Sequence, residues 1–148
     1  MSYKNALSTY KETRIKTAGQ GQLIIMLYDA GVQQLDQALE LMHLNETDRK
    51  DPARIEKIGK AVVKTQEIIA ELMASLDFEE GGDIAKNLFS LYAWFNRELL
   101  EGNMKQDIER IASIRNMIEG LRGAWQEIAA SSVSEAANHE VAGISITM

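Results

Sequence analysis

The chain of 148 residues contains no cysteine and a single proline, Pro52. Without cysteine, neither a disulfide-stabilised scaffold nor a thiolate metal site can form, and the composition suits a reducing compartment. Scarce proline, together with abundant leucine, isoleucine, alanine, glutamate, lysine and glutamine, favours long helices over strands. The sequence therefore predicts an all-α protein, and its length is enough for one domain with its own hydrophobic core.

Long hydrophobic runs are also absent. The longest uninterrupted apolar run ends at Asp29, and no segment approaches the roughly 20 apolar residues that a membrane-spanning helix needs. Residues 1–6 lack the basic start and the apolar run of a secretory signal. The net charge of −6 argues against a nucleic-acid partner, since phosphate backbones are bound by basic surfaces. We expect a cytoplasmic protein that neither inserts into a membrane nor binds nucleic acid.

Residues that carry chemistry are scarce as well. The chain has two histidines, His43 and His139. A di-metal site in a helical bundle needs two Glu-x-x-His pairs, whereas the sequence contains one, from Glu40 to His43. Nucleophilic catalysis needs a histidine beside a serine or cysteine, and neither histidine lies next to a serine-containing turn. We therefore expect no catalytic residue, no cofactor and no metal. A metal-dependent oxidase is the enzymatic alternative, and it requires metal binding.

The first two predicted helices are marked by apolar spacing and by a capping pair. The first covers residues 22–44 and is followed by a polar loop. Asp51 and Pro52 then supply the N-cap and the first-turn proline of the second helix. Its apolar residues alternate three and four positions apart, which is the heptad spacing of a helix that packs along one seam. They are Ile55, Ile58, Val62, Thr65, Ile69, Leu72 and Leu76.

The second half of the chain continues this pattern. Residues 77–82 contain Gly81-Gly82 and form a break, after which Asp83 is placed to cap a third helix that stops at Gly102-Asn103. The apolar residues of the third helix are Ile84, Leu88, Leu91, Phe95 and Leu99, and those of the fourth are Ile111, Ile114, Ile118, Leu121, Trp125 and Ile128. Short links make neighbouring helices antiparallel, so an antiparallel up-down-up-down four-helix bundle is predicted over residues 21–130. Residues 1–20 form a separate N-terminal segment, and residues 131–148 are expected to be a flexible tail.

Two stretches are more apolar than one buried helix face requires. Residues 23–28 read Leu-Ile-Ile-Met-Leu-Tyr, and residues 88–95 hold four of the nine aromatic residues. At about 100° per residue, six successive apolar side chains go around the whole helix, whereas a surface helix keeps one face polar. We therefore expect a groove in which this surplus apolar surface holds another polypeptide. Leu7 and Tyr10, three residues apart in a polar segment, form a smaller apolar group of the same kind.

Several motifs occur together in the order and spacing of one protein family. The chain reads Thr-Ala-Gly-Gln-Gly-Gln-Leu-Ile-Ile-Met-Leu-Tyr-Asp at 17–29, Leu-Met-Ala-Ser-Leu-Asp at 72–77 and Gly-Gly-Asp-Ile-Ala-Lys-Asn-Leu at 81–88, with Tyr10, Leu91-Tyr92 and Asn103. Over residues 7–128 this pattern resembles the flagellar export chaperones called FliS. The resemblance implies a cytosolic four-helix bundle that binds the C-terminal region of flagellin, prevents its premature polymerisation and assists its export by the flagellar type III apparatus.

The resemblance also implies which residues meet a partner. In the family, an N-terminal plug covers a hydrophobic pocket when no flagellin is bound, and the segment with Leu7 and Tyr10 is similar to that plug. The residues expected to contact flagellin or plug are Leu7, Tyr10, Ile24, Tyr28, Asp29, Asn87, Leu91, Tyr92 and Trp94. Among these, Asp29 and Asn87 are expected to supply hydrogen-bonding groups beside the groove. Periodicity alone leaves open which of the apolar residues face the groove and which face the core.

A different function for the same apolar faces stays open. A structural or regulatory bundle that self-associates, or that binds another flagellar regulator such as an anti-sigma factor, would carry the same surplus of apolar surface. Components of the export apparatus are further expected partners. Sedimentation of the protein alone and with flagellin distinguishes these functions, because a self-associated species indifferent to flagellin would support the alternative.

Overall fold

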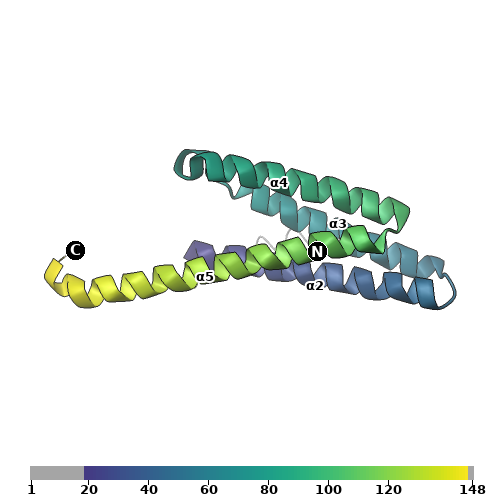
Figure 1. Cartoon of the computed structure of the whole chain (residues 1–148), viewed down its shortest axis with the longest axis horizontal. Coiled ribbons are helices and arrows are strands. Elements are labelled where there is room, and N and C mark those ends of the chain that lie inside the picture. The colour runs from purple at the N-terminus through teal and green to yellow at the C-terminus, as the bar shows by residue number, and fades with distance from the viewer. Residues whose placement is uncertain (1–18, 147–148) are drawn as a thin grey trace, which may run out of the picture.

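The computed structural model describes residues 19–146, and within this range every regular element is a helix. The helices are α2 (Gly19–Thr47), α3 (Pro52–Ala74), α4 (Phe78–Lys105) and α5 (Ile108–Ile146), joined by short links (Figure 1). The prediction of an all-α protein is confirmed. Leu7 and Tyr10 lie outside the described residues. None of the helices in this range combines the length and the apolarity that a membrane crossing needs.

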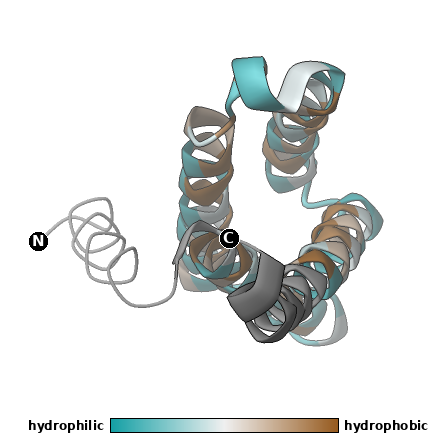
Figure 2. Cartoon of the chain, turned by 90° about the vertical axis from the view of Figure 1, so that its left-hand side faces the viewer, coloured by the Kyte–Doolittle hydropathy of each residue, from teal (hydrophilic) through white to brown (hydrophobic). Residues whose placement is uncertain are grey.

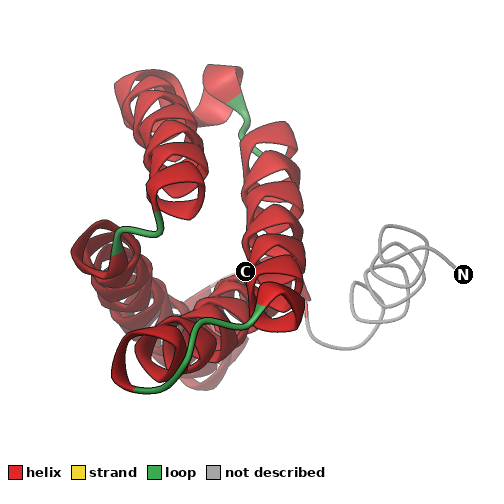
Figure 3. Cartoon of the chain, turned by 90° about the vertical axis from the view of Figure 1, so that its right-hand side faces the viewer, coloured by secondary structure: helices red, strands yellow, loops and turns green. Residues whose placement is uncertain are grey.

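Each helix packs against two neighbours. Helix α2 contacts α3 and α5, and α4 contacts the same two helices from the other side. Views from the two ends of the molecule show the four helices arranged around a common centre (Figures 2 and 3), and the colouring by residue number in Figure 1 shows that consecutive helices run in opposite directions. The predicted up-down-up-down bundle is therefore confirmed. Helix α5 continues to Ile146, beyond the ends of its neighbours (Figure 1), and the flexibility expected after residue 130 stays a prediction.

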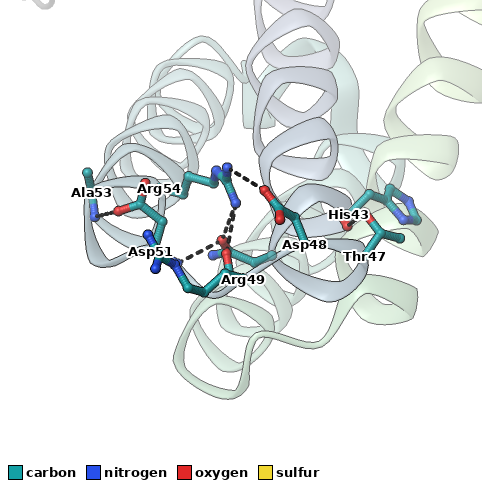
Figure 4. Close-up of polar contacts among 8 residues, drawn as sticks. His43, Thr47, Asp48, Arg49, Asp51, Ala53 and Arg54 are labelled. Carbon is teal, nitrogen blue, oxygen red and sulfur yellow. Dashed lines mark hydrogen bonds and ion pairs between the residues drawn. The ribbon is translucent and has the colours of Figure 1, made fainter.

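The start of α3 follows the predicted capping chemistry. Asp51 has an extended backbone, and its side chain accepts a hydrogen bond of 2.9 Å from the backbone N–H of Ala53, while Pro52 opens the helix. Figure 4 shows how the preceding loop is held: the guanidinium of Arg54 donates to the backbone oxygen of Arg49 at 3.0 Å and pairs with Asp48 at 3.3 Å. Hydrogen bonds from the Arg49 backbone and from Arg54 lower the pKa of the Asp48 carboxyl.

The corner between α3 and α4 differs from the prediction. Helix α4 begins at Phe78, inside the expected break, because the Asp77 side chain accepts hydrogen bonds of 3.0 Å from the backbone N–H groups of Glu79 and Glu80. The predicted break survives as a kink at Gly82, whose φ of 49° and ψ of −125° are not helical. A backbone in this region suits glycine and strains other residues.

The end of α4 lies slightly beyond the predicted Gly102-Asn103. The helix extends to Lys105 and stops at Gln106, which has a left-handed φ of 50°. The N–H groups of the two residues that follow the helix fold back onto its last carbonyls, Gln106 onto Asn103 at 3.3 Å and Asp107 onto Gly102 at 2.9 Å. This arrangement satisfies carbonyls that the helix end leaves unpaired.

The core largely follows the predicted seams. Helix α3 buries Ile58, Val62, Thr65, Ile69 and Leu72 as predicted, whereas Ile55, at the start of the seam, is 40% exposed. On α4, Ile84 is 71% exposed, and the buried line runs instead through Ala85, Tyr92, Phe95, Leu99 and Gly102. The prediction for Ile84 was wrong because this residue lies in the first turn after the kink at Gly82, at the open end of the bundle, where it lines a cleft and no helix covers it.

Candidate partner-binding cleft

An open, mostly apolar cleft of about 270 Å³ lies at the end of the bundle where α3 is joined to α4. Figure 2 looks onto this end of the molecule. All four helices contribute to the walls. The lining residues are Ile24 from α2; Leu72, Ser75 and Leu76 from the end of α3 and its link; Asp77, Glu80, Gly81, Ile84, Ala85, Leu88 and Tyr92 from the corner and α4; and Trp125 from α5.

A polar group lies at the inner side of this cleft. The hydroxyls of Tyr28 and Tyr92 share a hydrogen bond, and the indole N–H of Trp125 donates to the Tyr28 hydroxyl at 3.1 Å. Tyr28 is fully buried and Tyr92 is 2% exposed. Burial raises the pKa of both phenols above the ordinary value, so each carries its proton at neutral pH.

The outer side of the cleft combines apolar side chains with a short acidic rim. Ile84 is the most exposed apolar residue of the lining, at 71%. Phe78 and Phe89 follow the lining residues Asp77 and Leu88 in sequence; their rings contact each other with centroids 5.9 Å apart, and both remain about half exposed. Asp77 and Glu80 supply carboxylates at the corner. Such a surface can bury apolar side chains of a bound chain and disfavours an anionic one.

Two further features of the described residues bear on the choice of site. Within residues 19–130, no three histidine, aspartate or glutamate side chains are grouped as a metal site requires. A separate pocket of about 220 Å³ at the opposite end of the bundle contains Met42, Ile55 and Ile108 together with the side chains of Glu46 and Lys105. The apolar cleft by Tyr92 is therefore the surface best suited to a polypeptide partner.

Comparison with known proteins gives this cleft its context. The family model described as "Flagellar protein FliS" matches residues 3–132. The chain belongs to the FliS family. The Flagellar secretion chaperone FliS of Salmonella typhimurium is 32% identical over 118 residues, which cover 79% of this chain and 82% of that protein. The proteins of the same name from Vibrio cholerae and Bacillus subtilis are 28% identical over 129 residues and 24% identical over 127 residues. These alignments cover 84% and 86% of this chain, and 89% and 88% of the two relatives.

Membership of the FliS family confirms the resemblance on which the site prediction was based. The relatives compared above are named flagellar secretion chaperones. An apolar cleft formed by four helices agrees with that role, because a chaperone binds the apolar surface of another chain.

The described residues among those predicted from the FliS resemblance fall into three groups. The cleft brings together Ile24, Tyr28 and Tyr92, of which Tyr28 lies beneath the lining and is bonded to Tyr92. Asp29, next to Tyr28 on α2, forms an ion pair with Arg122 of α5. The remaining described residues lie outside the lining: Asn87 is exposed, and Leu91 and Trp94 are partly buried against the core.

Sequence reasoning overlooked several residues of the cleft. Leu72, Leu76, Leu88 and Trp125 were recognised as seam positions but not as lining residues, and Ile84 was assigned to the core. The sequence did contain a signal for these lining residues, namely the Gly81-Gly82 pair. A glycine kink interrupts the helix, so the apolar residues next to it need not all face the core. The cleft collects the apolar residues around that kink.

Proposed function

We propose that this protein is a cytoplasmic, non-enzymatic chaperone that binds the C-terminal region of flagellin, keeps it from polymerising prematurely and assists its export by the flagellar type III apparatus. Family membership supports the chaperone role. The observation that carries the choice of site is the apolar cleft, whose walls come from all four helices and whose rim leaves Ile84 71% exposed.

Recognition would follow the helix-in-groove mode, in which an amphipathic helix lays its apolar face into a groove. The cleft volume of about 270 Å³ accommodates a few apolar side chains, and the exposed Phe78 and Phe89 rings extend the apolar surface beside it. Covering the apolar faces of flagellin helices in this way would prevent those helices from pairing with one another before export. This binding requires neither nucleotide nor metal.

The N-terminal segment, residues 1–20, is proposed to act as the plug of this cleft. Ile24 lines the cleft only a few residues after the first residue of α2, Gly19, so the chain enters the bundle next to the cleft. Leu7 and Tyr10 would then compete with flagellin for the same apolar surface and keep the free chaperone from self-associating. Removal of residues 1–15 is expected to increase the binding of a hydrophobic dye and to tighten the binding of flagellin.

The test is isothermal titration of the full chain with a fragment that covers the flagellin C-terminal region. Ile84→Ser and Met104→Ser are a matched pair, because both residues lie on α4 and are 71% and 70% exposed, but Ile84 lines the cleft and Met104 lies at the other end of α4. Both substitutions should change stability by less than about 0.5 kcal/mol, as exposed positions do. Ile84→Ser should weaken binding about tenfold, since burial of an isoleucine contributes about 1.5–3 kcal/mol and part of this side chain is already covered.

Two results would contradict the proposal. An equal loss of affinity in Ile84→Ser and Met104→Ser would show that the cleft is not the binding site. A wild-type protein that does not bind the fragment, and that sediments as a self-associated species with or without flagellin, would favour the structural or regulatory bundle. Binding should also show a large negative heat-capacity change, because apolar surface is removed from water.

A further inference from the structure

The hydrogen-bonding capacity of the Tyr28–Tyr92–Trp125 group leaves one donor without a partner. The group has three donors, namely two phenol O–H groups and one indole N–H. The indole donates to Tyr28, and the two hydroxyls share one bond. Because one shared bond uses only one of the two hydroxyl hydrogens, the other phenol hydrogen has no acceptor among the described residues. Both phenols retain these hydrogens at neutral pH, since burial raises the pKa of each.

The surroundings decide which tyrosine carries the spare hydrogen. Tyr28 is fully buried, and the small cavity of about 10 Å³ beside it has only apolar atoms on its walls. A water in such a cavity would lack polar partners, so it cannot serve as an acceptor there. A Tyr28 hydrogen without an acceptor would cost about 1–3 kcal/mol. Tyr92 is 2% exposed but, unlike Tyr28, it is one of the residues that line the open cleft.

This difference in surroundings favours one order of bonds, in which the Trp125 N–H donates to Tyr28, the Tyr28 O–H donates to Tyr92, and the Tyr92 O–H is the donor left on the cleft side. Successive hydrogen bonds of this kind polarise one another and strengthen the last donor. An occupant of the cleft that displaces water from Tyr92 without replacing its hydrogen bond leaves a buried donor unpaired.

We propose that the Tyr92 hydroxyl is a specificity group that donates a hydrogen bond to a neutral side-chain oxygen of the polypeptide bound in the cleft, from an asparagine, glutamine, serine or threonine. This inference rests on the proposed function and adds the chemistry of recognition. A carboxylate is disfavoured by the nearby Asp77 and Glu80. Backbone carbonyls inside a bound helix are already paired within that helix. The partner is thus an amphipathic helix whose apolar face carries one neutral polar residue opposite Tyr92.

The first test compares Tyr92→Phe with Thr65→Val in the full chain, using the flagellin C-terminal fragment as the probe. Tyr92→Phe removes the donor that faces the cleft and should weaken binding about tenfold. Thr65→Val also removes one buried hydroxyl, but that hydroxyl donates to the Ala61 carbonyl inside the core and Thr65 is not part of the cleft lining, so its affinity should stay within about twofold of wild type. Equal affinities of wild type and Tyr92→Phe, or an equal loss in both variants, would overturn the inference. Absence of binding by the wild type would overturn the proposed function instead.

A second measurement separates recognition from a structural role of Tyr92. Each asparagine, glutamine, serine and threonine of the fragment is replaced in turn by an apolar residue of similar size. One replacement should lose about tenfold in affinity for the wild type and almost nothing for Tyr92→Phe, the non-additivity expected of residues in contact. Fully additive losses at every position would overturn the inference. In the free protein, NMR should find the Tyr28 hydroxyl proton protected from exchange and the Tyr92 proton exchanging quickly, and the reverse order would overturn the proposed direction of the bonds.

Discussion

Gly31 lies in the middle of α2 and offers a test of how tightly the bundle core is packed. A Cβ atom at this position would lie 3.9 Å from Ile68 Cγ2 and 4.0 Å from the methyl groups of Thr65 and Ile118, which are ordinary contact distances. The same residues border the cavity of about 10 Å³. Gly31→Ala should therefore fill space without a clash.

The expected gain in the stability of Gly31→Ala has two sources. Alanine is favoured over glycine inside a helix by about 0.8–1.0 kcal/mol, and burial of one further methyl group adds up to about 0.8 kcal/mol. We expect Gly31→Ala to raise the free energy of unfolding by about 1.5 kcal/mol. For a chain of this size that corresponds to an increase in Tm of about 3–6 °C. Urea titration followed by circular dichroism, together with a thermal scan, measures both quantities.

Two other glycines provide the controls. Gly120 lies exposed on α5, and a Cβ atom there would have no neighbouring atom within 4 Å, so Gly120→Ala should show the helix-propensity gain alone. At Gly102 a Cβ would approach Ile111 Cδ1 to 2.6 Å, and Ile111 is fully buried. Gly102→Ala should therefore destabilise by about 1 kcal/mol, because overpacking outweighs propensity. The reasoning is refuted if Gly31→Ala is no more stable than wild type or gains no more than Gly120→Ala.

Three further outcomes are expected. Asp77→Ala and Asp51→Ala should each lose about 1 kcal/mol of unfolding free energy with their N-cap bonds, but only Asp77→Ala, at the cleft, should also weaken flagellin binding in a titration. The folded protein binds the phenol protons of Tyr28 and Tyr92 more tightly than the unfolded chain, because burial raises both pKa values. The contribution of these two phenols to stability is therefore complete below pH of about 10 and declines above it. Thermal scans at increasing pH should show Tm falling in this range, and the fall should be smaller in Tyr92→Phe. Arg122→Gln, which removes a partly exposed ion pair between α5 and α2, should cost less than about 1 kcal/mol and less still in high salt; a loss independent of salt would contradict this.

The sequence allowed the bundle and most of its seams to be predicted, because helical periodicity and capping residues are local signals. The Asp51–Pro52 start of α3 is an example in which both residues play their expected roles. The corner at residues 77–82 could not be predicted as well. Two candidate caps, Asp77 and Asp83, compete there, and the choice depends on whether Gly82 ends the helix or only kinks it, which is decided by packing around the corner.

The cleft was harder to predict than the fold for a related physical reason. Ile24 and Ile25 are adjacent and equally apolar, yet Ile24 lines the cleft and Ile25 is 4% exposed in the interior. Hydrophobicity predicts that such side chains avoid water, but it does not indicate whether the cover comes from the chain itself or from a partner. The hydrogen bonds of Tyr28, Tyr92 and Trp125 connect three helices that are far apart in sequence, and no local pattern predicts them.

Tyr92 borders both the open cleft and the small internal cavity, so its ring acts as a partition between the outside of the bundle and its middle. Shortening this side chain would join the two spaces into one chamber that opens to solvent at one end. An alanine at this position would thereby leave a pocket with apolar walls and, at its inner side, the Tyr28 hydroxyl, and a small molecule bound in that pocket would project into the path of an incoming helix. The position of Tyr92 between the core and the cleft thus indicates where a small inhibitor of partner binding could be placed.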